Sequence, residues 1–203
     1  MRCQKLYRFA GWVLFFIAFI FLASCQKSAQ TESILNEAIY SDPSSFDPRA
    51  QVDAETYGIM YVIYNTLVEL DDSMQISPAL ASSWKTDDFQ TWRFSLRKDV
   101  YFHEDPCFKN DKKTRLLKAN DIEYSLNRAI QPGGVGAFIL TDIVKGASDV
   151  NEGKAKNASG IKVLDEYTIE ITLLNPYQKF PERLATPFLF IVAREAVQQY
   201  GEE

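Results

Sequence analysis

The single histidine of the chain, His103, stands four residues before Cys107, with Glu104 and Asp105 between them. A cysteine and a histidine can act as nucleophile and base, and all four side-chain types can ligate zinc. Pro106 and the surrounding charges favour a loop that offers no third group to orient the histidine. The cluster also has no recognised spacing of zinc ligands. We therefore expect His103 to be a structural loop residue and expect no metal site.

Other catalytic and phosphate-binding patterns are equally weak. The sequence has no G-x-S-x-G turn, and Gly133-Gly134-Val135-Gly136 lacks the lysine and Ser/Thr of a phosphate loop. It also lacks the longer spacing of a dinucleotide fingerprint. Acidic residues are abundant, but no spacing singles out a pair for glycoside hydrolysis. The residues favour a binding protein over an enzyme and indicate no cofactor.

The first 25 residues have the pattern of a bacterial lipoprotein signal. Three basic residues precede an uncharged run over residues 9–23, and Leu22-Ala23-Ser24-Cys25 follows. The run is shorter than the roughly 20 residues that span a bilayer. We expect cleavage after residue 24 and acylation of Cys25. The alternative is an uncleaved signal anchor in which Cys25 is incidental.

An acylated Cys25 predicts an exported protein, lipid-anchored to the cell membrane or outer membrane and facing the periplasm or exterior. Cys3 leaves with the signal, so Cys107 remains alone and no internal disulfide is expected. We expect Cys107 to be a packed or loop thiol, with a disulfide to another molecule as the alternative. Residues 1–24 hold three of the 22 basic residues and none of the 27 acidic ones, so the mature net charge is −8. This charge argues against nucleic acid as a partner.

The hydrophobic pattern predicts a mixture of strands and helices without strict βαβ alternation, which is a mixed α/β (α+β) fold. Strands are expected at residues 35–40, 92–97, 161–164, 168–173 and 188–192, the third and fourth forming a hairpin. Helices are expected from an Asp53 cap to Leu67, over 121–130 with Asn120 as cap, over 143–152 and over 194–200. Residues 104–118 should be a solvated loop, and Trp84, Trp92, Phe94 and Leu96 should be core.

Several segments together resemble the extracellular solute-binding proteins of peptide and nickel ABC transporters, the dipeptide/oligopeptide-binding family 5. Ser45-Phe46-Asp47-Pro48 resembles the "S-x-D-P" segment of the family. Further likenesses, in the family's order, lie at residues 64–67, 76–84, 91–103, 119–126, 161–174, 176–177 and 193–197. The sequence departs from the family at Asp99, where glycine is commoner, and in the expanded segment 104–118. The likeness covers nearly the whole mature chain.

The resemblance implies a periplasmic-binding-protein-like type II two-lobed fold, here incomplete and lacking most of the second lobe. Residues 1–24 would be the signal and 25–33 a polar tether. Residues 34–203 would be the N-terminal part of a family 5 domain. Within it, 34–58 and 176–203 would form first-lobe core and 59–175 the family's accessory subdomain.

The implied function is capture of peptides, nickel complexes or other small solutes outside the cytoplasm. A lipid-anchored receptor of this kind delivers its ligand to a permease and ATPase complex. By position, the resemblance places ligand contacts at two loops, formed by Gln51, Val52, Asp53 and Ala54 and by Val135, Gly136 and Phe138. For each of these residues a loop or capping role is the alternative, and Asp53 is a natural helix cap. The acid that pairs with a peptide's amino terminus would come from the later lobe.

Three other interpretations stay open. The chain could be a binding module used in sensing or adhesion, which neighbouring genes for a permease and an ATPase would distinguish from an importer. It could also be a non-functional truncated product. A lipoprotein hydrolase is disfavoured by the single histidine.

Overall fold

A four-stranded antiparallel sheet is the framework of the part described by the computed structural model, residues 42–43, 45–50 and 53–201. In spatial order its strands are β3 (Ala81–Lys85), β4 (Thr91–Leu96), β6 (Thr168–Thr172) and β5 (Ile161–Asp165). Alternation along β4 buries Trp92, Phe94 and Leu96, and Phe94 pairs with Ile169 across β6. The predicted strand, hairpin and core positions are therefore confirmed, with Trp84 partly buried against the same core.

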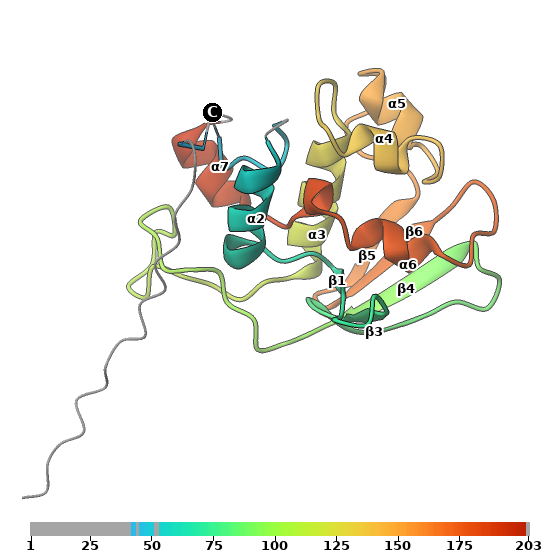
Figure 1. Ribbon diagram of the computed structural model, residues 1–203, viewed down its shortest axis with the longest axis horizontal. Coiled ribbons are helices and arrows are strands. Elements are labelled where there is room, and N and C mark those ends of the chain that lie inside the picture. The colour runs from blue at the N-terminus through green and yellow to red at the C-terminus, as the bar shows by residue number, and fades with distance from the viewer. Residues whose placement is uncertain (1–41, 44, 51–52, 202–203) are drawn as a thin grey trace, which may run out of the picture. The chain divides into compact units, whose positions relative to one another are not determined.

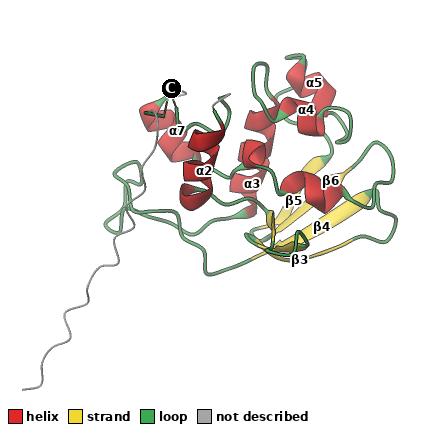
Figure 2. Ribbon diagram, in the orientation of Figure 1, coloured by secondary structure: helices red, strands yellow, loops and turns green. Residues whose placement is uncertain are grey.

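Helices cover one side of this sheet (Figures 1 and 2). The longest, α3 (Ala119–Ile130), places Ile122, Leu126 and Ile130 in the core, as its helical spacing predicted. The short helix α6 (Phe180–Leu184) adds the ring of Phe180, whose centroid lies 6.2 Å from that of Trp92. Arg93 and Glu170, by contrast, form an ion pair of 2.8 Å in which the arginine side chain is 48% exposed.

The remaining elements connect and flank this core. They are α2 (Ala54–Ile63), β1 (Val68–Leu70), β2 (Ile76–Pro78), α4 (Ala137–Leu140), α5 (Ala147–Asn151), the 3-10 helix η1 (Pro187–Leu189) and α7 (Arg194–Tyr200). The strands β1 and β2 pair as a separate antiparallel hairpin that was not predicted. Within the described residues, none of the helices combines the length and the apolar composition needed to cross a membrane.

Two predicted helix boundaries are wrong. The helix after Asp53 ends at Ile63, not Leu67, because Tyr64 turns to an extended conformation while its N–H still bonds to the Met60 carbonyl. The helix α3 begins at Ala119, so Asn120 is not its cap. Lys118 occupies the cap position, and its backbone N–H donates to Asp121 at 2.9 Å. Capping by Asp53 and the helix at Arg194–Tyr200 are confirmed.

Two other predicted elements also differ. The helix expected over 143–152 is shorter than predicted: within that range the structure has only α5, and Gly146 precedes it at φ 77°, a conformation that favours glycine. A Cβ at Gly146 would lie 2.6 Å from Ser159 Oγ. The strand expected over 188–192 is absent from the described structure, where η1 leads into a segment with no strand partner. Its Val192 is held instead by the side chain of Ser125.

The segment 104–118 is less solvated than predicted. Cys107 and Phe108 are buried against Ala193, which confirms the packed thiol but contradicts a wholly solvated loop. Apolar burial rather than charge decides the position of this stretch. The predicted signal, tether, Cys25 and strand 35–40 lie outside the described residues, as do Gln51 and Val52.

Candidate functional site

The structure brings the segment 45–50, which precedes the first predicted ligand loop, against the second predicted loop. The N–H of Val135 donates to the carbonyl of Arg49 at 3.2 Å, and Arg49 Nη2 donates to the carbonyl of Pro132 at 2.6 Å. The segment that leads to Asp53 is therefore hydrogen-bonded to the loop that leads to Phe138. Sequence reasoning did not single out Arg49, because its partners lie more than 80 residues away.

Asp53 and Ala54 lie at the start of α2, which follows Arg49 in the chain. The Asp53 carboxylate accepts from the Thr56 backbone N–H and from its hydroxyl, both at 2.9 Å. The Thr56 N–H is the main cause that holds the pKa of Asp53 below its usual value. Asp53 is thus engaged as a helix cap, and Ala54 is exposed beside it.

Gly136 fixes the approach of the second loop. A Cβ on Gly136 would lie 2.6 Å from the Ala129 Cβ and 3.0 Å from the Phe188 carbonyl oxygen, both too close for a larger residue. The glycine therefore lets the start of α4 pack directly on η1. Val135 is partly exposed, and Phe138 is 65% exposed.

Three aromatic side chains lie in contact near these segments, Tyr57 of α2, Phe138 of α4 and Phe188 of η1, and we call them the aromatic wall. The Phe188 ring makes edge contacts with Phe138 at 5.0 Å and with Tyr57 at 5.2 Å between centroids. Sequence reasoning assigned Phe188 to a buried strand. Pro187, which disfavours a central strand, was the available signal against that assignment. A partly exposed aromatic surface can contact the side chains of a ligand without selecting one type.

A cavity of about 360 Å³ lies elsewhere, between the segment 46–48, the loop 100–108 and α7. Its lining is largely apolar; Asp47, Asp105 and Arg128 are its charged members, and His103 and Cys107 also line it. None of the predicted ligand residues within the described ranges lines it. We therefore distinguish the cavity from the aromatic wall.

The cavity holds the two residues that first suggested catalysis. Burial, followed by hydrogen bonding to Asp105 and the nearby carboxylate charges, raises the pKa of the Cys107 thiol to about 11. A nucleophilic cysteine needs the opposite shift. His103 is exposed, with Nε2 3.4 Å from the Ile63 carbonyl oxygen. In the part of the chain that the structure describes, no group of three or more His, Cys, Asp and Glu residues could hold a metal ion.

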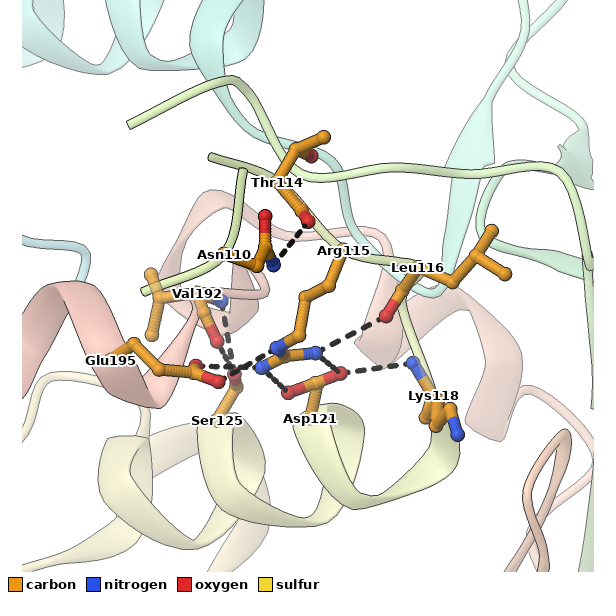
Figure 3. A network of polar contacts seen from close by, with 9 residues as sticks. All are labelled: Asn110, Thr114, Arg115, Leu116, Lys118, Asp121, Ser125, Val192 and Glu195. Carbon is orange, nitrogen blue, oxygen red and sulfur yellow. Dashed lines mark hydrogen bonds and ion pairs between the residues drawn. The ribbon is translucent and has the colours of Figure 1, made fainter. Parts of the chain in front are cut away.

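A polar network attaches the C-terminal segment to α3 (Figure 3). Arg115 donates to both oxygens of Asp121 at 2.7 and 2.8 Å, and to both oxygens of Glu195 at 2.7 Å. The hydrogen bonds from Arg115 hold the pKa of Glu195 below its usual value, against an opposing effect of burial. Ser125 accepts from the Val192 N–H at 3.0 Å and donates to its carbonyl at 3.2 Å. The chain that follows Phe188 is thus fixed to the same helix that precedes Val135.

The described residues thus form a hydrogen-bonded junction between two segments and an aromatic wall, and the raised pKa of Cys107 disfavours its use as a nucleophile. Matches to known proteins identify the family of the chain. A family profile for bacterial extracellular solute-binding proteins, family 5 (middle region), matches residues 75–202. The chain belongs to this family, which confirms the expected membership.

Relatives in this family are named for peptide binding. The oligopeptide-binding protein AliB of Streptococcus pneumoniae is 27% identical over 187 residues, which cover 91% of this chain and 28% of AliB. The periplasmic oligopeptide-binding protein OppA of Haemophilus influenzae is 30% identical over 168 residues, covering 80% of this chain and 29% of the relative. The chain thus spans less than a third of the length of these relatives.

Solved structures confirm the fold class. OppA of Burkholderia pseudomallei superposes with a TM-score of 0.67 at 28% identity, covering 77% of this chain and 30% of that one. Haemophilus influenzae OppA in complex with RPPGFSPFR gives 0.67 at 27%, covering 79% and 31%. The described unit therefore has the mixed α/β fold of part of an OppA-type binding protein.

Proposed function

We propose that this chain supplies the first wall of the ligand cleft in a peptide-binding component of an ABC importer, held at the membrane by lipid on Cys25. The names of its relatives support the ligand class. The observation that carries the proposal is the aromatic wall, whose ring contacts join elements that are remote in sequence, with the junction at Arg49 and Val135 as a further contact between those segments. Extended peptides are held largely through their main chain, so an aromatic surface suits loose side-chain selectivity.

The proposed domain organisation follows the sequence expectation. Residues 34–58 and 176–203 form first-lobe core, and 59–175 form the accessory subdomain that contains the four-stranded sheet. Contacts from α3 to Asp47 on one side and to Val192 on the other support an interface between these two parts. Closure of two lobes on a ligand, presented to a permease, is the mechanism that this organisation serves.

The ligand surface can be mapped with the peptide RPPGFSPFR and the isotopically labelled chain. Because the chain spans less than a third of its relatives, we expect weak binding, with a Kd on the order of 1 mM. Amide chemical shifts should change at residues 53–57, 135–138 and 188 as peptide is added to millimolar concentration. Shifts confined to the cavity residues 100–108, or no shifts, would overturn the proposal.

Two matched variants sharpen this test. Phe138 is 65% exposed on the aromatic wall, and Tyr101 is 58% exposed in the lining of the cavity. Both can be truncated at little cost in stability, because neither side chain is in the core. We expect Phe138→Ala to reduce the peptide-induced shifts at least about threefold and Tyr101→Ala to leave them unchanged. The reverse result would assign the ligand to the cavity.

The lipid anchor has its own test. In cells fed a labelled fatty acid, we expect Cys25→Ala to lose the label and to leave the membrane fraction. Cys3→Ala is the control, because Cys3 lies in the segment that the signal interpretation removes. Unchanged membrane association of Cys25→Ala would contradict lipid anchoring and leave the peptide-binding proposal to its separate test.

A further inference from the structure

Two faces of α3 are buried, and they have opposite character. One face carries apolar residues into the core of the sheet. The other carries three polar residues at spacings of four and three, so they share one side of the helix, and each is about 5% exposed or less: Asp121, Ser125 and Arg128. Burying polar groups is costly unless each one is paired. The second face is therefore built for specific partners.

Each polar residue of this face holds a different part of the chain. Asp121 binds Arg115, and through it Glu195 of α7. Ser125 exchanges two hydrogen bonds with the backbone of Val192. Arg128 forms a two-pronged ion pair with Asp47, Nη1 to Oδ1 at 2.6 Å and Nη2 to Oδ2 at 2.5 Å, although 81 residues separate them.

The ion pair of Arg128 continues to the aromatic wall. Asp47 Oδ1 also accepts from the Arg49 N–H at 2.9 Å, and the Asp47 carbonyl accepts from the Ala50 N–H at 2.9 Å. This turn presents the carbonyl of Arg49 to the N–H of Val135. One buried carboxylate therefore connects Arg128 to the loop that carries Phe138.

We propose that Arg128 is a positioning residue of the aromatic wall, which sets the loop 132–138 against the segment 45–50 through Asp47. A guanidinium fork fixes both distance and orientation, whereas an apolar contact would let the two segments slide. Buried ion pairs are weak contributors to net stability, so a positioning role accounts better for the cost of burying this one. The inference rests on the proposed function for what the wall binds, but not for how the wall is held.

Amide hydrogen exchange of the full chain, followed by peptide mass spectrometry, tests the position of the loop without a ligand. In Arg128→Met we expect exchange over residues 132–138 to become at least about tenfold faster, with the segments of β4 and β6 unchanged. Arg128→Lys keeps the charge but loses the fork, so it should restore part of the protection. Arg93→Met is the matched control, since it removes a partly exposed ion pair within the sheet and should leave 132–138 unchanged.

Unchanged exchange at 132–138 in a folded Arg128→Met variant would overturn the proposal. If β4 and β6 also lose protection in Arg128→Met, the same exchange measurement is made on Asp47→Asn. This variant keeps the shape of the Asp47 side chain and leaves Arg128 in place. If backbone amides lose protection throughout the chain in both variants, the Arg128–Asp47 ion pair serves overall stability and the proposal is overturned. Titration with RPPGFSPFR is a separate experiment. If the wild-type chain shows no shift changes with the peptide, the proposed function is refuted, but the exchange result still decides the role of Arg128.

Discussion

Removal of Arg115 is expected to destabilise the fold through two carboxylates of unequal burial. Arg115→Met keeps the length of the side chain but leaves Asp121 and Glu195 without their shared partner. The Asp121 side chain is 7% exposed, whereas that of Glu195 is 37% exposed. The guanidinium also lies 4.9 Å from the ring centroid of Phe102 and 5.6 Å from that of Phe108. The substitution therefore removes two ion pairs and two cation–π contacts together.

The exposed fractions of these side chains set the expected loss of free energy of unfolding. Breaking a fully buried ion pair from one side costs roughly 3–5 kcal/mol, and an exposed pair is worth about 1 kcal/mol or less. Because Arg115 itself is 28% exposed, water screens part of the cost. We expect Arg115→Met to lower the free energy of unfolding by about 2–3 kcal/mol, mostly through Asp121. Glu195→Gln should cost only about 0.5–1 kcal/mol.

Urea unfolding followed by tryptophan fluorescence measures these differences, with Trp84 and Trp92 as reporters in the sheet. At an m-value of about 2 kcal/mol per molar urea, the Arg115→Met midpoint should fall by roughly 1 M. Arg93→Met is the arginine control and should shift it by less than about 0.5 M. An Arg115→Met midpoint equal to that of wild type would refute the reasoning. So would a Glu195→Gln variant as unstable as Arg115→Met, because burial would then not decide the cost.

Two further predictions concern pH and reactivity. Burial acts to raise the pKa of Asp47, but hydrogen bonds from Arg128 and Arg49 outweigh it and hold the pKa below its usual value. A carboxylate with a lowered folded-state pKa stabilises the fold above its unfolded-state pKa, so the urea midpoint should stay level above about pH 5 and fall below about pH 4. Asp47→Asn should be less stable at pH 7 and show a shallower acid loss; an identical acid profile would contradict this role. Because the pKa of Cys107 is raised to about 11, its alkylation by iodoacetamide at pH 8, followed by peptide mass spectrometry, should be roughly 200-fold slower than that of a free cysteine. Labelling at the free-thiol rate would show that the thiol is accessible and ionised.

The sequence predicts elements well where local pattern and tertiary packing agree. The alternation of Trp92, Phe94 and Leu96 has the period of a strand, and the spacing of Ile122 and Leu126 has that of a helix, so burial reinforces both. The strand expected at 188–192 fails because a short apolar run has no period of its own. Its conformation depends on Ser125, which lies 67 residues earlier. No local signal encodes that partner.

The candidate site likewise contains parts that the sequence predicts and parts that depend on contacts with remote segments. Family resemblance predicts the two loops at Asp53 and Val135 from their position relative to the matching motifs. It does not supply Phe188 or Arg128, whose roles arise from contacts with remote segments. A charged residue on a helix is ordinarily predicted to face solvent, since arginine is rarely buried without a partner. Only the position of Asp47 reveals why Arg128 faces inward.

Arg115 precedes α3 and pairs with Asp121 on it, whereas Arg128 lies on α3 itself, and we expect the first arginine to serve stability and the second to serve positioning. Arg115 ties α7 to the helix through a network that is partly open to solvent, whereas Arg128 is 5% exposed and ties the N-terminal segment to the loop of the aromatic wall. If both pairs served stability alone, the two methionine variants would alter urea unfolding and loop exchange in proportion. If α3 positions the wall, Arg115→Met should lower stability while residues 132–138 stay protected relative to the sheet, and Arg128→Met should expose that loop while the sheet stays protected. The proposed peptide-binding role requires the loops that contact a ligand to be fixed to one rigid element, and the buried polar face of α3 would meet that requirement.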